Sequence, residues 1–165
     1  MPVFRLPGLP DPTEPYAPRS TNAVTLAIVH HSASPLTTTI QQIDAEHRAR
    51  GFIYVGYHFT IDTNGNIDLG RPLWAIPAAA YGYNSNSVDI CCIGNFQSDD
   101  PGYTGPPSDH QVAALTDLLI WCHHQVPTID RTCGHGDLMA DACPGNKLEE
   151  LLPGIKQKIR TAIHI

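Results

Sequence analysis

The chain has 165 residues and a mass of 18.0 kDa, which suits one domain, or one domain with a terminal extension. Hydrophobic residues make up 42% and charged residues 16%, which is enough apolar material for a core and excludes wholesale disorder. The formal net charge of -6 argues against nucleic acid as a partner, because a phosphate backbone is bound by clustered Lys and Arg. No run approaches the roughly 18 apolar residues that a membrane span requires.

The start of the chain is rich in proline and shows little periodicity. We therefore expect an N-terminal proline-rich arm over 1–22 and one folded domain over 23–165. Prolines and acidic residues interrupt the first segment, which lacks the pattern of a secretory signal peptide.

The five cysteines argue against a disulfide framework, because their number is odd and two of them, Cys91 and Cys92, are adjacent. A reducing compartment is the expected environment. A cysteine with a special role is then expected to be a metal ligand or a nucleophile.

Strand and helix patterns alternate along the chain. Strands are expected over 25–31, 53–61, 88–94 and 128–133, which are rich in apolar or β-branched residues. Helices are expected over 38–50, 109–125 and 147–162, where apolar residues recur at helical spacing. The dipeptide Asn64-Gly65, between two apolar runs, predicts a hairpin turn. This alternation predicts an α/β layer fold.

The segment from 133 to 145 carries the strongest chemical signal. It places His135 and Cys143 eight residues apart in a loop that follows an expected strand. Imidazole nitrogen and thiolate sulfur are preferred zinc ligands, and the glycines beside His135 allow a tight backbone that can aim both at one point. The spacing alone is weak evidence for a metal, because loop histidines are common.

A second element is the pair His30-His31 at the end of the first expected strand. Ligands gather at strand ends in α/β sheets, although one buried and one exposed structural histidine would give the same pattern. Strand alternation sends the two rings to opposite faces, so only one can join His135 and Cys143. Three protein ligands with a fourth position open are typical of a catalytic zinc site, which fits hydrolysis of an amide or ester.

Four segments occur in order along the chain: IVHHSAS, VGYHFTIDTNGNI, GYNSNSVDICCIGNF and GHGDLMADACPG. Together they resemble the zinc-dependent N-acetylmuramoyl-L-alanine amidases, a family that includes phage amidases and peptidoglycan recognition proteins. The resemblance covers about residues 24–160. It implies one α/β domain with a central mixed β-sheet flanked by helices. It also implies one Zn2+ per chain and hydrolysis of the amide between N-acetylmuramic acid and L-alanine of the stem peptide.

The resemblance also assigns roles to individual residues. Its motifs match the zinc ligands to His30, His135 and Cys143. They match Tyr57 to the tyrosine that assists catalysis near the bound water, where its hydroxyl can orient the nucleophile or donate a hydrogen bond to the developing oxyanion. Without the family, Tyr57 would be interpreted as an aromatic residue of the core.

The loop over 82–87 is expected to border the substrate groove. Asn and Ser side chains can hydrogen-bond amides and sugar hydroxyls, and the resemblance favours substrate contact at Asn84 or Asn86. The alternative is an ordinary loop, since these residue types dominate turns.

Position 141 departs from the family pattern. Two residues before the cysteine, many family amidases carry Lys and others Thr, thought to stabilise the transition-state oxygen; here the residue is Asp141. Asp141 could act as general base for the zinc water. It could instead be a bystander, with Lys147 or a backbone N–H supplying the positive element. In a third interpretation catalysis is weak or lost, which leaves a binding protein.

The expected function is a zinc amidase acting on bacterial peptidoglycan, with a peptidoglycan-binding module of the same fold as the alternative. A redox or regulatory protein is a third class, disfavoured because the chain has no Cys-x-x-Cys pair. We expect a monomer that acts on muropeptides, without nucleic acid and without membrane insertion. It would be made in the cytoplasm and reach the wall after lysis or specialised release, so a phage lysis enzyme, a housekeeping amidase and a bacterial effector look alike.

Overall fold

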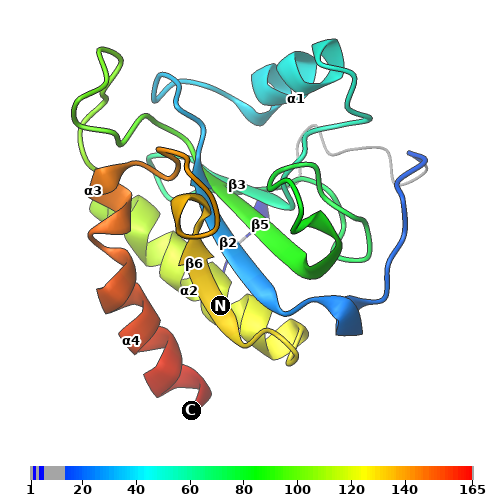
Figure 1. The fold of residues 1–165 in the computed structure, drawn as a ribbon. Coiled ribbons are helices and arrows are strands. Elements are labelled where there is room, and N and C mark those ends of the chain that lie inside the picture. Colours follow the sequence, from blue (N-terminus) through cyan, green and yellow to red (C-terminus); the bar gives the residue numbers. More distant parts are fainter. Residues whose placement is uncertain (1, 3, 6–13, 165) are drawn as a thin grey trace.

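The computed structural model describes residues 2, 4–5 and 14–164, and its centre is a six-stranded sheet with the order β1-β4-β3-β5-β2-β6 (Figure 1). The strands are β1 Phe4–Arg5, β2 Leu26–His31, β3 Phe59–Ile61, β4 Ile67–Leu69, β5 Ser87–Cys92 and β6 Arg131–Gly134. Strands β3 and β4 are antiparallel, and every other neighbouring pair is parallel. The prediction of an α/β domain with a central mixed sheet is confirmed.

The helices are α1 Ile40–Ala49, α2 Asp109–Gln125, α3 Asn146–Glu149 and α4 Leu152–Ile163, with 3-10 turns at Thr21–Ala23, Asn84–Asn86 and His135–Asp137. Thr39 and Ser108 begin α1 and α2 as N-caps, each accepting a hydrogen bond from a backbone N–H of the first turn. Helices α2 and α4 pack side by side on the sheet, while α1 lies apart from them (Figure 1). Within the part of the chain that the structure describes, no helix has both the length and the apolar character needed to cross a membrane.

Strand alternation gives the sheet two different faces. Val29 and Ile90 belong to the main core with α2 and α4. His30 and Asp89, their neighbours in sequence, point to the other face, because successive side chains of a strand alternate. Both are fully buried, at 1% and 0% exposed. Buried titratable groups require hydrogen-bonding partners, so a polar site has to lie on this second face.

The expected strand over 53–61 is wrong over its first six residues, since only Phe59–Ile61 forms a strand of the sheet. The backbone of Gly56 bonds away from the sheet. The N–H of Gly56 donates to Nδ1 of His47, and its carbonyl accepts from the N–H of Ala78 at 3.0 Å. A Cβ at position 56 would lie 2.2 Å from the Ala78 carbonyl oxygen, so the chain can make this approach only with glycine.

The expected helix over 147–162 is divided into α3 and α4. Pro153 stands at the start of α4 and has no N–H, so it cannot donate to the carbonyl of Glu149 four residues earlier. The hairpin expected at Asn64-Gly65 is present, because β3 and β4 pair across it.

The described residues near the N-terminus pack against the domain. Tyr16 is buried, with its ring 6.0 Å from the ring of Trp74, and Pro18 forms an isolated bridge with Ala75. Arg19 donates hydrogen bonds to the carbonyl of Leu73. Residues 1, 3 and 6–13 of the expected arm lie outside the described residues.

Candidate metal centre and active site

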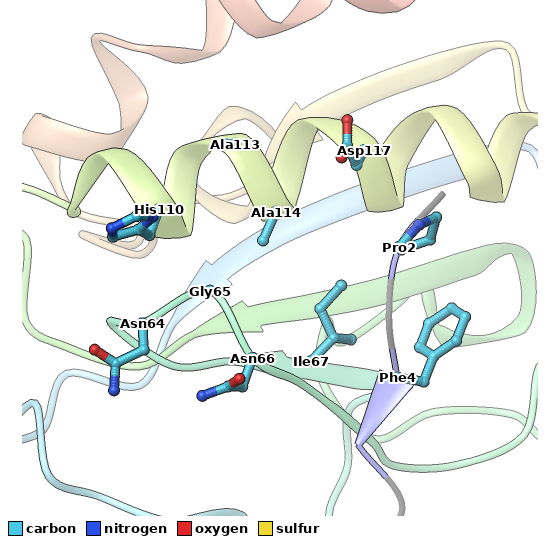
Figure 2. Close-up of a pocket in the computed structure, with 10 residues that line it drawn as sticks. All are labelled: Pro2, Phe4, Asn64, Gly65, Asn66, Ile67, His110, Ala113, Ala114 and Asp117. Atoms are coloured by element: carbon cyan, nitrogen blue, oxygen red, sulfur yellow. The ribbon is translucent and has the colours of Figure 1, made fainter.

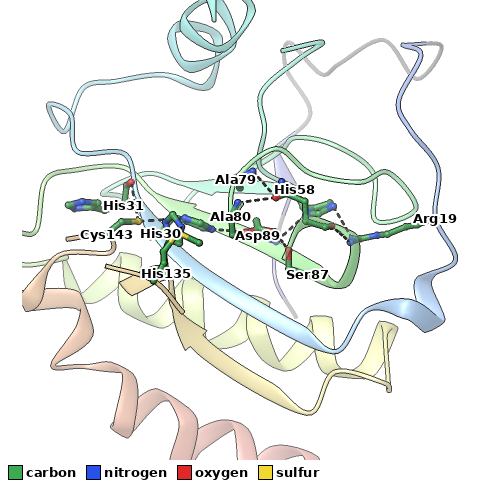
Figure 3. A network of polar contacts seen from close by, with 12 residues as sticks. Arg19, His30, His31, His58, Ala79, Ala80, Ser87, Asp89, His135 and Cys143 are labelled. Carbon is green, nitrogen blue, oxygen red and sulfur yellow. Dashed lines mark hydrogen bonds and ion pairs between the residues drawn. The ribbon is translucent and has the colours of Figure 1, made fainter. Parts of the chain in front are cut away.

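Three side chains from distant parts of the chain converge at the carboxyl end of β2. They are His30 of β2, His135 directly after β6, and Cys143 of the following loop (Figure 3). Their possible ligand atoms all lie within 4.8 Å of one another. Nδ1 of His30 is 3.5 Å from Sγ of Cys143, and the His30 and His135 ring centroids are 4.8 Å apart. The structure therefore brings together the residues that the sequence proposed as metal ligands.

The loop between His135 and Cys143 folds back on itself through its own backbone. The N–H of Gly136 donates to the carbonyl of Cys143 at 2.7 Å. Oδ1 of Asp141 accepts from the N–H of Cys143 at 2.8 Å. Gly145, with φ of 86°, ends the loop in a conformation that favours glycine. These contacts aim the thiol of Cys143 back toward His135.

His30 is held on its other side by Asp89. Nε2 of His30 lies 2.6 Å from Oδ1 of Asp89, and both side chains are buried. Burial by itself opposes protonation of His30, but the hydrogen bonds and charges of Asp89 and Cys143 prevail and raise its pKa to about 9. The partnership with His30 likewise holds the pKa of Asp89 below its usual range, although burial acts in the opposite direction.

The thiol of Cys143 is biased toward its thiolate form. Burial acts to raise its pKa, but hydrogen bonds from His135 and His30 outweigh burial and lower it. The four other cysteines are all free and buried, and among them Cys91 and Cys92 have pKa values raised by burial. Cys143 is thus the cysteine best suited to bind a metal.

His31 does not join the cluster, in agreement with strand alternation. Its Nδ1 accepts a hydrogen bond from the N–H of Phe96 at 3.1 Å, and burial lowers its pKa to about 4. A neutral ring with this backbone contact supports the loop that follows β5.

Two of the cavities have entirely different lining residues. One of about 240 Å³ opens beside Cys143 and is also lined by Gln97, Asp137, Asp141, Asn146 and Glu149. A larger one, of about 530 Å³, lies between the hairpin turn and α2, where Figure 2 shows Asn64, His110 and Asp117 around it. Of these two, the first is the one lined by a residue of the converging cluster.

Comparison with known proteins finds a matching family and individual relatives. Residues 20–146 match the family model described as N-acetylmuramoyl-L-alanine amidase. The chain belongs to this amidase family. A peptidoglycan-recognition protein of Drosophila simulans is 36% identical over 155 residues, which cover 88% of this chain and 82% of that protein. The endolysin of Klebsiella phage KP32 is 33% identical over 124 residues, which cover 73% of this chain and 80% of the endolysin.

Solved structures of the family also share the fold. The N-acetylmuramoyl-L-alanine amidase LysC from Clostridium intestinale URNW superposes with a TM-score of 0.76 at 26% identity, and the match covers 99% of both chains. The whole described domain is therefore built on the architecture of this amidase family.

The predicted family tyrosine, Tyr57, lies directly beside the cluster. Its ring centroid is 5.2 Å from that of His30 and 5.5 Å from that of His47. Burial, together with the nearby thiols of Cys91 and Cys143, raises the pKa of Tyr57 well above its usual value. Its hydroxyl therefore stays protonated near neutral pH and can donate a hydrogen bond.

Asp141 and Lys147, the two charged residues considered for transition-state contact, are both engaged locally. Asp141 is exposed, and its carboxylate accepts from the Cys143 N–H. Nζ of Lys147 lies 3.4 Å from Oε1 of Glu150, on the exposed surface. Their predicted roles in catalysis stay predictions.

The structure gives both predicted substrate-binding asparagines partners within the protein. Oδ1 of Asn84 accepts from the N–H groups of Ala79 and Ala80. Nδ2 of Asn86 donates to Oγ1 of Thr25, next to the amino end of β2. At about 3.3 Å per residue, this position is roughly 16 Å along the strand from His30. Asn86 therefore lies away from the cluster, and substrate contact at either residue stays a prediction.

Asp89 is the residue of the site that sequence analysis missed. It stands alone as a charged residue inside the apolar strand β5. A lone acid in a buried strand requires a partner, and this signal was present in the sequence. The sequence did not show which residue is that partner, because the pairing depends on the register between β5 and β2.

Proposed function

We propose that this chain is a zinc-dependent amidase that hydrolyses the amide bond between N-acetylmuramic acid and L-alanine of bacterial peptidoglycan. The observation that carries the proposal is the convergence of His30, His135 and Cys143 at one strand end. Membership of the amidase family and likeness to a phage endolysin support the reaction and the substrate class.

The donor set suits zinc. Two imidazoles and a thiolate are ligands that zinc prefers, and the lowered pKa of Cys143 favours the thiolate. Three protein ligands leave one position for water or substrate. When bound, zinc lowers the pKa of its water and polarises the scissile carbonyl. His30, His135 and Cys143 would each supply one ligand atom, for one Zn2+ per chain.

Tyr57 supplies the hydrogen-bond donor in this proposal. Its ring packs beside His30, and its raised pKa keeps the hydroxyl proton in place. A donor held next to the reacting carbonyl stabilises negative charge as it develops on the oxygen.

Asp141 takes part either as a general base or only as a support of the loop. The hydrogen bond from the Cys143 N–H to its Oδ1 favours loop support. Asn can accept the same bond but cannot take a proton, whereas Ala can do neither. An unchanged rate in Asp141→Asn, with a loss only in Asp141→Ala, would exclude the base role.

A peptidoglycan-binding module without turnover is the second candidate function. It is favoured by the carboxylate at position 141, where many family amidases carry Lys, and by the relatives named as recognition proteins. Both candidate functions use the same partner, bacterial peptidoglycan or its muropeptides, with the protein acting as a monomer on the cell wall after lysis or specialised release.

Mass analysis of peptidoglycan digested with the zinc-loaded protein tests the proposal. We expect free stem peptides that begin with L-alanine, loss of release with chelator, and about one zinc per chain by elemental analysis. His135→Ala should abolish both zinc binding and release, whereas His124→Ala, at an exposed position near the end of α2, should change neither. Zinc binding without any release of stem peptide would support the binding module instead.

A further inference from the structure

The contact between Asp89 and His30 joins two buried side chains on neighbouring parallel strands (Figure 3). Ile28 is the register partner of Asp89, and His30 is the register partner of Cys91. Asp89 and His30 therefore lie diagonally on the same face of the sheet, two residues apart in register. The strand pairing itself brings the carboxylate to the ring.

The geometry determines which ring nitrogen of His30 is available. A carboxylate only accepts hydrogen bonds, so at 2.6 Å from Oδ1 of Asp89 the Nε2 atom must carry a proton. In the neutral ring the lone pair is then on Nδ1, the atom that faces Sγ of Cys143. The contact with Asp89 selects the tautomer in which His30 presents a ligand atom toward the cluster.

Two further contacts hold Asp89 in place, one to its carboxylate and one to its backbone. Oγ of Ser87 donates to its Oδ2 at 2.6 Å. The backbone N–H of Asp89 donates to Nδ1 of His58 at 3.0 Å, and Nε2 of His58 lies 3.1 Å from the carbonyl oxygen of Ala75. Both carboxylate oxygens of the buried Asp89 are therefore engaged, one by His30 and one by Ser87.

We propose that Asp89 is a positioning residue, whose carboxylate holds His30 in the tautomer and orientation that direct Nδ1 toward the metal. This inference rests on the proposed function, because it takes the cluster to be a zinc site. Outer carboxylates that orient metal-binding histidines raise the basicity of the ring and limit its rotation. Asp89 is one strand away from the ligand and touches no substrate in this role.

Zinc affinity, measured by competition with a chromophoric chelator, tests the role directly. Asp89→Asn keeps the shape and an acceptor oxygen but removes the charge, and Asp89→Ala removes both. Loss of an outer partner typically weakens metal affinity by about 10- to 100-fold, so we expect roughly tenfold for Asn and roughly 100-fold for Ala. Asp130→Asn, the same change at an exposed position, should bind zinc as the wild type does. An Asp89→Ala protein with wild-type zinc affinity would overturn the proposal.

The tautomer gives a readout that remains available even if Asp89→Ala does not fold. Long-range 1H–15N spectra of the zinc-loaded wild type, with His30 assigned by comparison with His30→Gln, report the state of each ring nitrogen. We expect zinc on Nδ1 and a retained proton on Nε2. Zinc bound through Nε2 would contradict the role of Asp89.

These outcomes separate the inference from the function on which it rests. A wild-type protein that binds no zinc removes the proposed function and the inference together. A wild type that binds zinc and releases stem peptides, beside an Asp89→Ala variant of equal affinity, removes the inference alone.

Discussion

The backbone N–H of Gly136 donates to the carbonyl of Cys143 at 2.7 Å, and this bond joins the two ends of the loop that carries His135 and Cys143. The approach requires the absence of a side chain. A Cβ at position 136 would lie 2.7 Å from the Asp141 carbonyl oxygen and 3.0 Å from that of Cys143. Both obstacles are backbone atoms of the loop itself.

Gly136→Ala should therefore separate Cys143 from His135. We expect a cost of about 1–3 kcal/mol in the free energy of unfolding of the zinc-loaded protein, typical of overpacking, together with weaker zinc binding. Gly154→Ala is the matched control, because a Cβ there meets no atom within 4 Å and the position is helical. It should stabilise the protein by roughly 0.5 kcal/mol. Denaturant unfolding with and without chelator measures the free energy of unfolding of each variant and how much of it depends on zinc. Equal effects of Gly136→Ala and Gly154→Ala would contradict the expectation.

Tyr57→Phe should lower kcat about 100-fold, as expected when one donor to a developing oxyanion is lost. The variant keeps the ring beside His30 and removes only the hydroxyl. Zinc affinity should stay within about twofold of the wild type, since Tyr57 is not one of the three clustered ligands. Rates of stem-peptide release and zinc titrations on the same samples separate the two effects. An unchanged kcat would show that Tyr57 serves only as a core aromatic.

Features with local signals were predictable from the sequence. An N-cap and an apolar stripe predicted the helix that begins after Ser108. Closely spaced glycines predicted the loop that carries His135 and Cys143. The break before α4 also had a local signal in Pro153, which the helical periodicity concealed.

Features that depend on contacts between distant segments were not predictable in this way. Gly56 leaves the sheet because it bonds to His47 and Ala78. Asp89 meets His30 across 59 positions of sequence, through the register of two strands. Neither register nor loop packing is encoded in the periodicity of a single strand, so the outer support of the site appeared only in three dimensions.

Arg19 should contribute to stability although it lies within the expected arm. Its guanidinium donates to the carbonyls of Leu73 and Asn84, and burial lowers its pKa to about 10. Arg19→Met keeps the length of the side chain but leaves both carbonyls without this donor, which should lower the free energy of unfolding by about 1–3 kcal/mol. Arg160→Met, at an exposed position of α4, should have little effect. Equal unfolding curves for the two variants would show that the contacts of Arg19 do not contribute to the stability of the folded domain.

Glu149 should make stability depend on pH near neutrality. Burial, followed by the neighbouring carboxylate of Asp137, raises the pKa of Glu149 to about 7, while the charge of Lys156 acts in the opposite direction. The folded pKa lies above the ordinary value of 4.5, so the folded state retains a proton that the unfolded chain has released. The stabilisation is complete below about pH 4.5 and is lost as the pH rises through about 7.

Glu149→Gln removes this titration while keeping a polar group beside Asp137. The variant should match the wild type near pH 5 and exceed it near pH 8, by about 1 kcal/mol or less because solvent screens this partly exposed group. Glu150→Gln, at an exposed position paired with Lys147, should show no such divergence. Unfolding of the chelator-treated proteins across this range gives the difference directly, since the titrations of the metal ligands are common to all three. Parallel pH curves for Glu149→Gln and the wild type would mean that Glu149 is already ionised in the folded protein at pH 5.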